Sequence, residues 1–399
     1  MMSLTHARDV VHSRRQRSTV IFGAATLFYW ASLYVYVPVL PVYALSLGAS
    51  FVVVGLMVSA YGFSQLCLRI PIGLASDRWG RRKPFSVIGL LFASAGCVVL
   101  FFAPSPGWLV VGRAVVGISA ATWVTTTVMF SDYFEPAQLP GAMALLTFLS
   151  GLSQLVSTGA GGWLADLDGP RAPFVVGIVF GVVGAILLFL VPEERAQKKS
   201  TATWKSMAKV GTSSYLLRVS IVGALLQFTF WATTYAFVPV YADSLGASKT
   251  VLGLLTSGAL VPYTLASLAV SRWAVRVGAA RLATVGLAIC VVGAGVVPLT
   301  HSIALLAASQ CLAGLGRGLT MPVLLGLAIQ RIAPSEKATA MGVFQAVYAI
   351  GMFLGPASAG LIAESLGLTG AFLISASMCL AAVVVLAGGR KDWKTVPAL

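Results

Sequence analysis

Charged side chains gather in one short segment of an otherwise apolar chain. Asp77 stands within residues 73–83, a segment that also contains Arg78, Arg81 and Arg82. A single carboxylate among guanidinium groups is suited to forming ion pairs rather than to acid–base catalysis. Asp77 can therefore pair with these basic residues or with a helix amino terminus. The alternative is that the charges of this segment serve only to fix the topology of the chain in the membrane.

Two arginines lie inside apolar stretches. Arg113 is five residues into the stretch 108–131, and Arg317 lies midway along the stretch 303–330. None of the 12 acids lies deep in such a stretch, although a central arginine costs about 2.5–3.5 kcal/mol without a partner. For Arg113 a structural or gating role is favoured. Arg317 either contacts an anionic or zwitterionic substrate or bonds helix carbonyls, whereas Arg69 can snorkel from near its helix end.

Aromatic and amide side chains recur at helical spacing in three other stretches. Such groups bind ring faces and hydroxyl groups, although lipid-facing aromatic residues give the same pattern. We expect these side chains to line a substrate cavity together with Arg113 and Arg317. They are Trp30, Tyr34, Gln227, Trp231, Tyr235, Gln345 and Tyr348.

The sequence contains no H-E-x-x-H, G-x-S-x-G or P-loop pattern, which argues against an enzyme. Its 5 cysteines all fall in apolar stretches and form no C-x-x-C pair, so we interpret them as small hydrophobic residues. We accordingly expect no catalytic residue, no cofactor and no metal.

The composition is that of a membrane protein. Hydrophobic residues make up 58% of the 399 residues and charged residues only 10%, against about 25% charged in soluble domains. The net charge of +15 would suggest nucleic acid on a soluble protein. Here the basic residues lie in short runs between apolar stretches, which is typical of cytoplasmic loops. We therefore expect the protein to lie in a lipid bilayer and not to bind nucleic acid.

Twelve apolar stretches are long enough to span a bilayer. Each is predicted to be a helix, because backbone groups in hydrocarbon must satisfy their own hydrogen bonds. The fold class is therefore an all-α membrane protein. The stretches are 19–44, 51–73, 84–103, 108–131, 139–165, 173–192, 218–242, 249–272, 280–300, 303–330, 338–363 and 370–389.

The distribution of basic residues predicts the orientation. Loops that would lie outside contain only Arg171 and Lys249, whereas the other loops are rich in Arg and Lys. Both termini are thus predicted to be cytoplasmic, in a multi-pass protein of the cytoplasmic (inner) membrane. The first stretch is too long for a signal peptide.

The chain repeats itself at an offset of 198 residues. Between residues 41–56 and 239–254, 12 of 16 positions are identical, where chance gives about one. Six helices per copy place both copies the same way through the membrane, which is a transporter architecture. The predicted regions are an N-terminus 1–18, a bundle 19–192, a linker 193–217, a second bundle 218–389 and a tail 390–399.

The charged segment resembles the loop signature G-x-x-x-D-R-x-G-R-R of the major facilitator superfamily. The matching residues are Gly73, Asp77, Arg78, Gly80, Arg81 and Arg82. This resemblance implies two six-helix bundles of 12 transmembrane helices that rock about a central cavity. It also implies a gate network, whose members here would be Asp77, Arg81 and Asp132.

A second resemblance points to the drug and metabolite efflux branch. The antiporter motif G-x-x-x-G-P-x-x-G-G keeps only its last two glycines in the fifth helix, and the eleventh helix keeps it nearly intact. These helix-packing residues are Gly161, Gly162, Gly351, Gly355, Pro356 and Gly360.

We therefore expect a monomeric secondary transporter for a small-molecule substrate, which exports amphipathic metabolites or drugs, with protons as a candidate coupling ion. One alternative is an importer or facilitator of an organic anion or sugar. Another is a non-transporting membrane sensor or scaffold.

Overall fold

The computed structural model describes residues 2–135, 138–193, 211–332 and 336–388, and within these residues every regular element is a helix. This confirms the all-α prediction. The first half contains α1 (Met2–Tyr34), α2 (Leu40–Ser46), α3 (Phe51–Trp79), α4 (Lys83–Phe101), α5 (Pro106–Ala121), α6 (Trp123–Ser131), α7 (Leu139–Asp168) and α8 (Ala172–Leu190).

The second half contains two short irregular helices among its α-helices. Its elements are α10 (Ser214–Phe230), the π-helix η1 (Trp231–Phe237), α11 (Val238–Ser244), α12 (Lys249–Val277), α13 (Ala279–Gly295), the 3₁₀ helix η2 (Val297–Leu299), α14 (Ile303–Gln330) and α15 (Lys337–Gly388). Ten helices of the described residues are long and apolar enough to cross a membrane, and one of these, 339–388, contains the last two predicted spans.

Two predicted spans are interrupted. The first one breaks between α1 and α2, because Pro38 and Pro41 supply no backbone N–H to a helix. In the second half, the same place holds the π-helix η1 instead of a break. The fourth span divides at Thr122 into α5 and α6. The aromatic residues in and beside these irregular segments, such as Trp123 and Trp231, therefore point in directions that a continuous α-helix would not give them.

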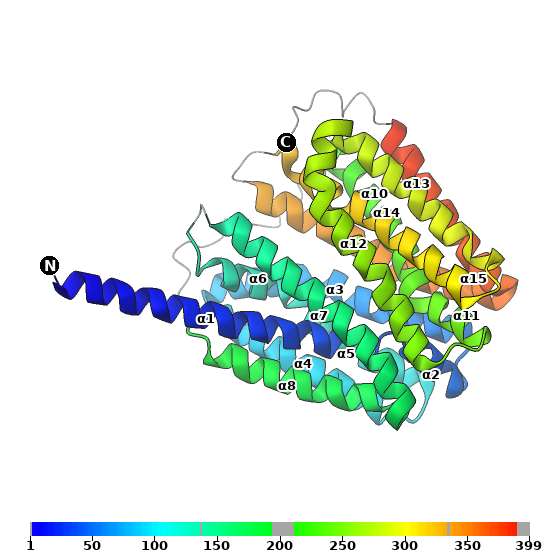
Figure 1. Ribbon diagram of the computed structural model, residues 1–399, viewed down its shortest axis with the longest axis horizontal. Coiled ribbons are helices and arrows are strands. Elements are labelled where there is room, and N and C mark those ends of the chain that lie inside the picture. The colour runs from blue at the N-terminus through cyan, green and yellow to red at the C-terminus, as the bar shows by residue number, and fades with distance from the viewer. Residues whose placement is uncertain (1, 136–137, 194–210, 333–335, 389–399) are drawn as a thin grey trace.

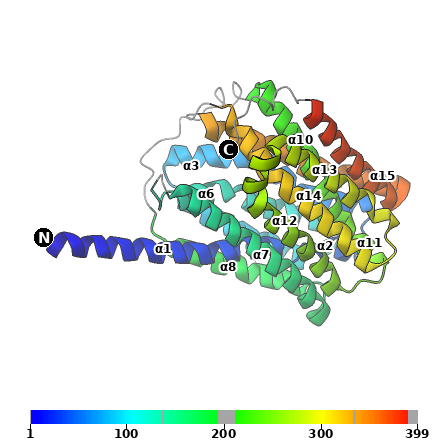
Figure 2. The same cartoon turned by 45° about the horizontal axis from the view of Figure 1, so that its top comes forward.

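The boundaries differ slightly from those expected. Helix α1 already begins at Met2, within the predicted N-terminal segment, and it projects beyond the bundles in both views (Figures 1 and 2). Helix α10 begins at Ser214, four residues before the expected start. The predicted linker residues 194–210 and the tail 390–399 lie outside the described residues.

The internal repeat is visible in the backbone. Helices α3 and α12 correspond residue for residue at the offset of 198, and so do α2 and α11. The six glycines with positive φ also form three pairs at this offset: Gly48 and Gly246, Gly80 and Gly278, and Gly169 and Gly367. Each is a turn that favours glycine. The duplication therefore fixed the helix ends as well as the helices.

The two halves form two bundles, which lie side by side and diverge toward one end (Figure 1). We name the end that carries residues 80–82 the basic end and the end that carries residues 47–50 the far end. One hydrophobic core contains residues of both bundles, among them Val35, Val54 and Phe237. The other core contains residues of the second bundle alone. Contact between the bundles is therefore concentrated at the far end.

Candidate functional site

Aromatic rings from both bundles meet between them. Tyr61 of α3 stacks on Trp231 of η1, with centroids 5.2 Å apart and planes at 21°. Tyr34 of α1 meets Tyr235 of η1 edge to face, with centroids 5.8 Å apart. All four rings are buried. We call these four rings the roof. We call the chamber the region between the bundles that extends from the roof toward the basic end, where Trp30, Gln345 and Tyr348 are partly exposed.

Arg113 lies on the first-bundle side of this roof. Its guanidinium carbon is 4.5 Å from the centroid of Tyr61, and Nη1 donates to the Tyr36 hydroxyl at 3.1 Å. The side chain is only 2% exposed. Among the described residues, no carboxylate forms an ion pair with it. The buried charge is therefore stabilised by ring faces and a phenol.

Arg317 lies on the second-bundle side. Its guanidinium carbon is 3.8 Å from the ring centroid of Phe230 and 4.8 Å from that of Tyr263. Nη2 donates to Gln227 Oε1 at 3.4 Å. Phe230 in turn contacts Tyr235, and Tyr235 contacts Trp231. With the stack of Trp231 on Tyr61, these rings form a continuous series from Arg317 in one bundle to Arg113 in the other.

The predicted cavity residues Trp30, Gln345 and Tyr348 lie at the walls of the chamber. Trp30 contacts Tyr34 at 5.6 Å and also Trp123, at 5.0 Å between centroids. All three wall residues are partly exposed. The predicted aromatic residues Trp30, Tyr34, Trp231 and Tyr235 thus lie in one connected group of rings, whereas Gln227 contacts Arg317 and Gln345 contacts Arg69.

Sequence reasoning missed several residues of the chamber, among them Trp123 and Tyr61. Trp123 begins α6 directly after the break at Thr122, and its contacts required the tertiary structure. Tyr61, on the other hand, shares a helix face with Gln65 and Arg69, since the three are spaced by four residues. That regular polar spacing in an apolar helix was a signal available in the sequence.

Arg69 does not snorkel toward the surface but reaches the other bundle. Its Nη1 donates to Gln345 Oε1 at 3.0 Å and to the Tyr348 hydroxyl at 3.1 Å, both on α15. Its Nη2 donates to Gln65 Oε1 at 2.5 Å. The partners lie in the neighbouring bundle because α3 packs against α15. Arg69 therefore links the two bundles through neutral acceptors.

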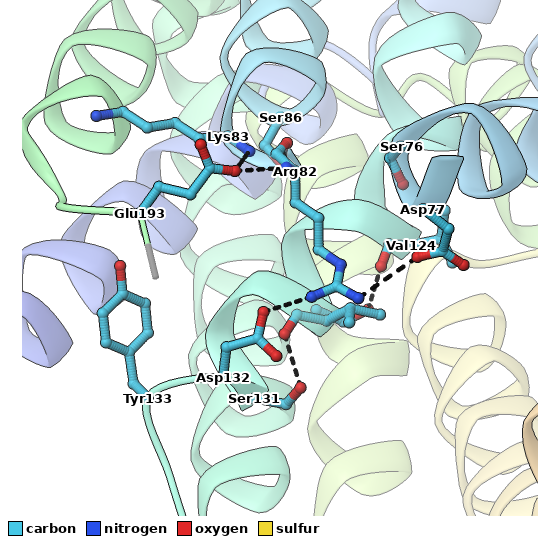
Figure 3. Close-up of polar contacts among 12 residues, drawn as sticks. Ser76, Asp77, Arg82, Lys83, Ser86, Val124, Ser131, Asp132, Tyr133 and Glu193 are labelled. Carbon is cyan, nitrogen blue, oxygen red and sulfur yellow. Dashed lines mark hydrogen bonds and ion pairs between the residues drawn. The ribbon is translucent and has the colours of Figure 1, made fainter. Parts of the chain in front are cut away.

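The charged segment forms an ion-pair network at the basic end (Figure 3). Arg82 connects Asp132 at the end of α6, at 2.5 Å, with Asp77 on α3, at 3.4 Å. Arg81, which the resemblance placed in this position, is exposed and forms no ion pair with a described residue. The reason is the turn at Gly80, with φ of 68°, which directs the second of the two arginines toward α6.

The rest of the signature stabilises the same corner of the first bundle. Glu193, beyond α8, accepts hydrogen bonds from the backbone N–H groups of Arg82 and Lys83 at the start of α4. Gly73 faces Val124 of α6, and Arg78 is exposed. All members of this network among the described residues belong to the first bundle, which agrees with the divergence of the bundles at the basic end.

At the far end, each bundle caps a helix of the other. Asp166 at the end of α7 accepts from the backbone N–H groups of Lys249, at 3.0 Å, and Thr250, at 2.7 Å. Glu364 on α15 accepts from the backbone N–H of Phe51 at 2.8 Å. The offset of 198 relates Asp166 to Glu364 and Phe51 to Lys249. The duplication has thus produced two equivalent inter-bundle caps.

Glycines permit the bundles to approach this closely. A Cβ added at Gly162 would lie 2.2 Å from the carbonyl oxygen of Lys249, and one at Gly55 would lie 2.3 Å from that of Pro356. Both contacts join different bundles. Of the other motif glycines, Gly360 faces α3 of the first bundle. Within a bundle, Gly161 faces Val35, and Gly351 and Gly355 face α10.

Known proteins share this architecture. The chain is 24% identical over 352 residues to an uncharacterised MFS-type transporter of Methanocaldococcus jannaschii, covering 85% of this chain and 89% of that one. It is 31% identical over 159 residues to multidrug resistance protein 1 of Bacillus subtilis, covering 40% of each. The crystal structure of a bacterial homologue of the human lysosomal transporter Spinster, inward-facing and occupied, superposes with a TM-score of 0.80 at 17% identity, covering 94% and 97%.

The sequence profile described as Major Facilitator Superfamily matches residues 22–243 and 219–397. These matches together span nearly the whole chain and overlap between the halves. Because the profile, the duplicated bundles and the solved structure agree, this chain belongs to the major facilitator superfamily of membrane transporters.

Proposed function

We propose that the protein exports amphipathic organic solutes across the cytoplasmic membrane. The observation that carries this proposal is the chamber, at which aromatic side chains from both bundles meet. Ring faces bind the apolar body of a solute without demanding one shape. The partial similarity to a multidrug resistance protein supports export over import.

The arrangement of the bundles supports uptake of the solute from the cytoplasm. The excess of basic residues in the loops of the basic end assigns this end to the cytoplasm. In the structure the far end is closed by the two caps and the glycine contacts, whereas the bundles diverge at the basic end. Release outside then requires the far-end contacts to break while the basic end closes.

The network of Asp77, Arg82 and Asp132 is suited to gating this second state. It lies beside the divergence of the bundles, and its ion pairs are partly exposed. Such pairs contribute at most about 1 kcal/mol each, so they can exchange partners when the second bundle approaches. We infer that the loop contacts the second bundle in the outward-open state.

Transport into inside-out vesicles and proteoliposomes tests the proposal. A panel of fluorescent amphipathic solutes should accumulate in vesicles that contain the protein. Trp231→Ala should abolish the accumulation, because this ring closes the roof of the chamber. Trp163→Ala is the matched control, since Trp163 is 54% exposed on the outer surface of its bundle.

Solute entry only from the far end would favour the alternative of an importer or facilitator. Binding without any flux, in wild type and in control, would favour the sensor or scaffold. Equal flux in wild-type and Trp231→Ala vesicles would show that the chamber is not the route.

A further inference from the structure

The charges that a solute can reach in the chamber are all positive. Arg69 of the first bundle and Arg317 of the second are both partly exposed, and Arg113 lies buried behind the roof. Neither of the two accessible guanidinium groups forms an ion pair with a carboxylate among the described residues. The chamber therefore holds two accessible cationic side chains, one from each bundle, with no countercharge shown beside them.

The present partners of these arginines are neutral. Arg69 donates to the amide oxygens of Gln65 and Gln345 and to a phenol, and Arg317 donates to the amide oxygen of Gln227. A hydrogen bond to an amide oxygen satisfies one N–H but leaves the positive charge uncompensated. A carboxylate accepts stronger, charge-assisted hydrogen bonds from the same guanidinium group.

Hydrogen-bond donors are also left over around the chamber. The Nε–H groups of Arg69 and Arg317 and the Nε2 amide of Gln65 are buried and have no partner. Gln65 itself is 96% buried, as its exposed fraction is 4%, and its only oxygen already accepts from Arg69. These three N–H groups are covered by the protein, so a ligand would be bound by the Nη groups of the two arginines, whose present acceptors are neutral.

Building on the proposed function, we propose that the chamber selects aromatic organic anions and that Arg69 and Arg317 supply the positive charge that attracts and binds the negative group. The oxygen atoms of a carboxylate, sulfonate or phosphate replace the neutral amide oxygens on an arginine. The ring of the solute lies against the exposed faces of Trp30 and Trp123.

Three matched probes test this selection: 1-naphthylacetate, the neutral 1-naphthylacetamide and the cation (1-naphthylmethyl)trimethylammonium. Dissociation constants are measured by equilibrium dialysis with the full chain in nanodiscs of phosphatidylcholine, which contain no anionic lipid headgroup. The anion should bind at least about tenfold more tightly than the cation, which corresponds to one charge-assisted bond.

Arg69→Gln and Arg317→Gln should each weaken binding of 1-naphthylacetate about tenfold and leave binding of the neutral amide within about twofold. Arg218→Gln, which removes an exposed arginine from α10, is the control for net charge and should change neither. Arg69→Lys and Arg317→Lys keep the charge and should keep the preference for the anion, which guards against variants that fail to fold.

Equal affinity for anion and cation, or unchanged anion affinity in both Gln variants, would overturn the proposal. If neutral solutes are still transported in that case, the proposed export stands and only the charge selection fails. If anionic lipid in the nanodiscs displaces 1-naphthylacetate competitively, the same arginines bind a lipid headgroup, and the selection for soluble aromatic anions is refuted.

Discussion

The paired caps at the far end should stabilise the closed far end. Asp166 and Glu364 accept backbone N–H groups at the starts of α12 and α3, where the first turn of a helix leaves donors unpaired. Ser248 and Ser50 already accept from the third helical residue. Asp166→Asn and Glu364→Gln therefore remove the negative charge of the inter-bundle caps, keep an amide oxygen in its place, and leave the local serine caps intact.

The magnitude follows from the position of these groups. A carboxylate near a helix amino terminus contributes about 0.3–1 kcal/mol when exposed, and both acids are exposed. The double variant should thus shift the equilibrium between closed and open far ends by about 0.6–2 kcal/mol, or about 3- to 30-fold in population. Each single variant should shift it by less and still exchange solute.

The assay is a distance distribution between spin labels at Ser46→Cys and Ser244→Cys, in a background that lacks the native cysteines. These two exposed positions are repeat equivalents, one in each bundle at the far end. The double variant should gain a population at longer distance. Asp168→Asn, an exposed acid without an inter-bundle bond among those described, is the matched control. The reasoning is wrong if the distribution of the double variant matches that of this control.

Three further predictions concern the basic end, the bundle contact and the coupling. Arg82→Gln should reduce transport and lower the melting temperature because it breaks two ion pairs, whereas Arg81→Gln should change neither; equal effects would contradict the network. Gly162→Ala should reduce the population with a closed far end, measured with the same pair of spin labels, since the added Cβ would lie 2.2 Å from the carbonyl oxygen of Lys249. Gly258→Ala is its control and should leave that population unchanged, because a Cβ there meets nothing within 4 Å. An unchanged distance distribution in Gly162→Ala would refute this contact. No acid lies deep within a predicted membrane span, so counterflow of labelled solute should proceed in proteoliposomes without a pH gradient. A strict requirement for a pH gradient would mean that a carboxylate at the end of a span carries the proton.

The sequence by itself determined the helices and their duplication. Hydrocarbon surroundings oblige each apolar stretch to form its own backbone hydrogen bonds, so the spans follow from local composition. The offset of 198 residues was equally visible, and it already related Asp166 to Glu364. The helical spacing of Trp231 and Tyr235 placed them on one face, because that face depends only on the period of the helix.

Only the tertiary structure decided which residues meet. The turn at Gly80 selects Arg82 over Arg81 as the partner of Asp132, because a left-handed residue redirects the chain by an amount that no spacing rule reports. Arg69 found its partners on α15, which lies more than 260 residues away along the chain. Such contacts depend on how two rigid bundles are placed against each other, and that placement is a property of the whole fold rather than of any segment.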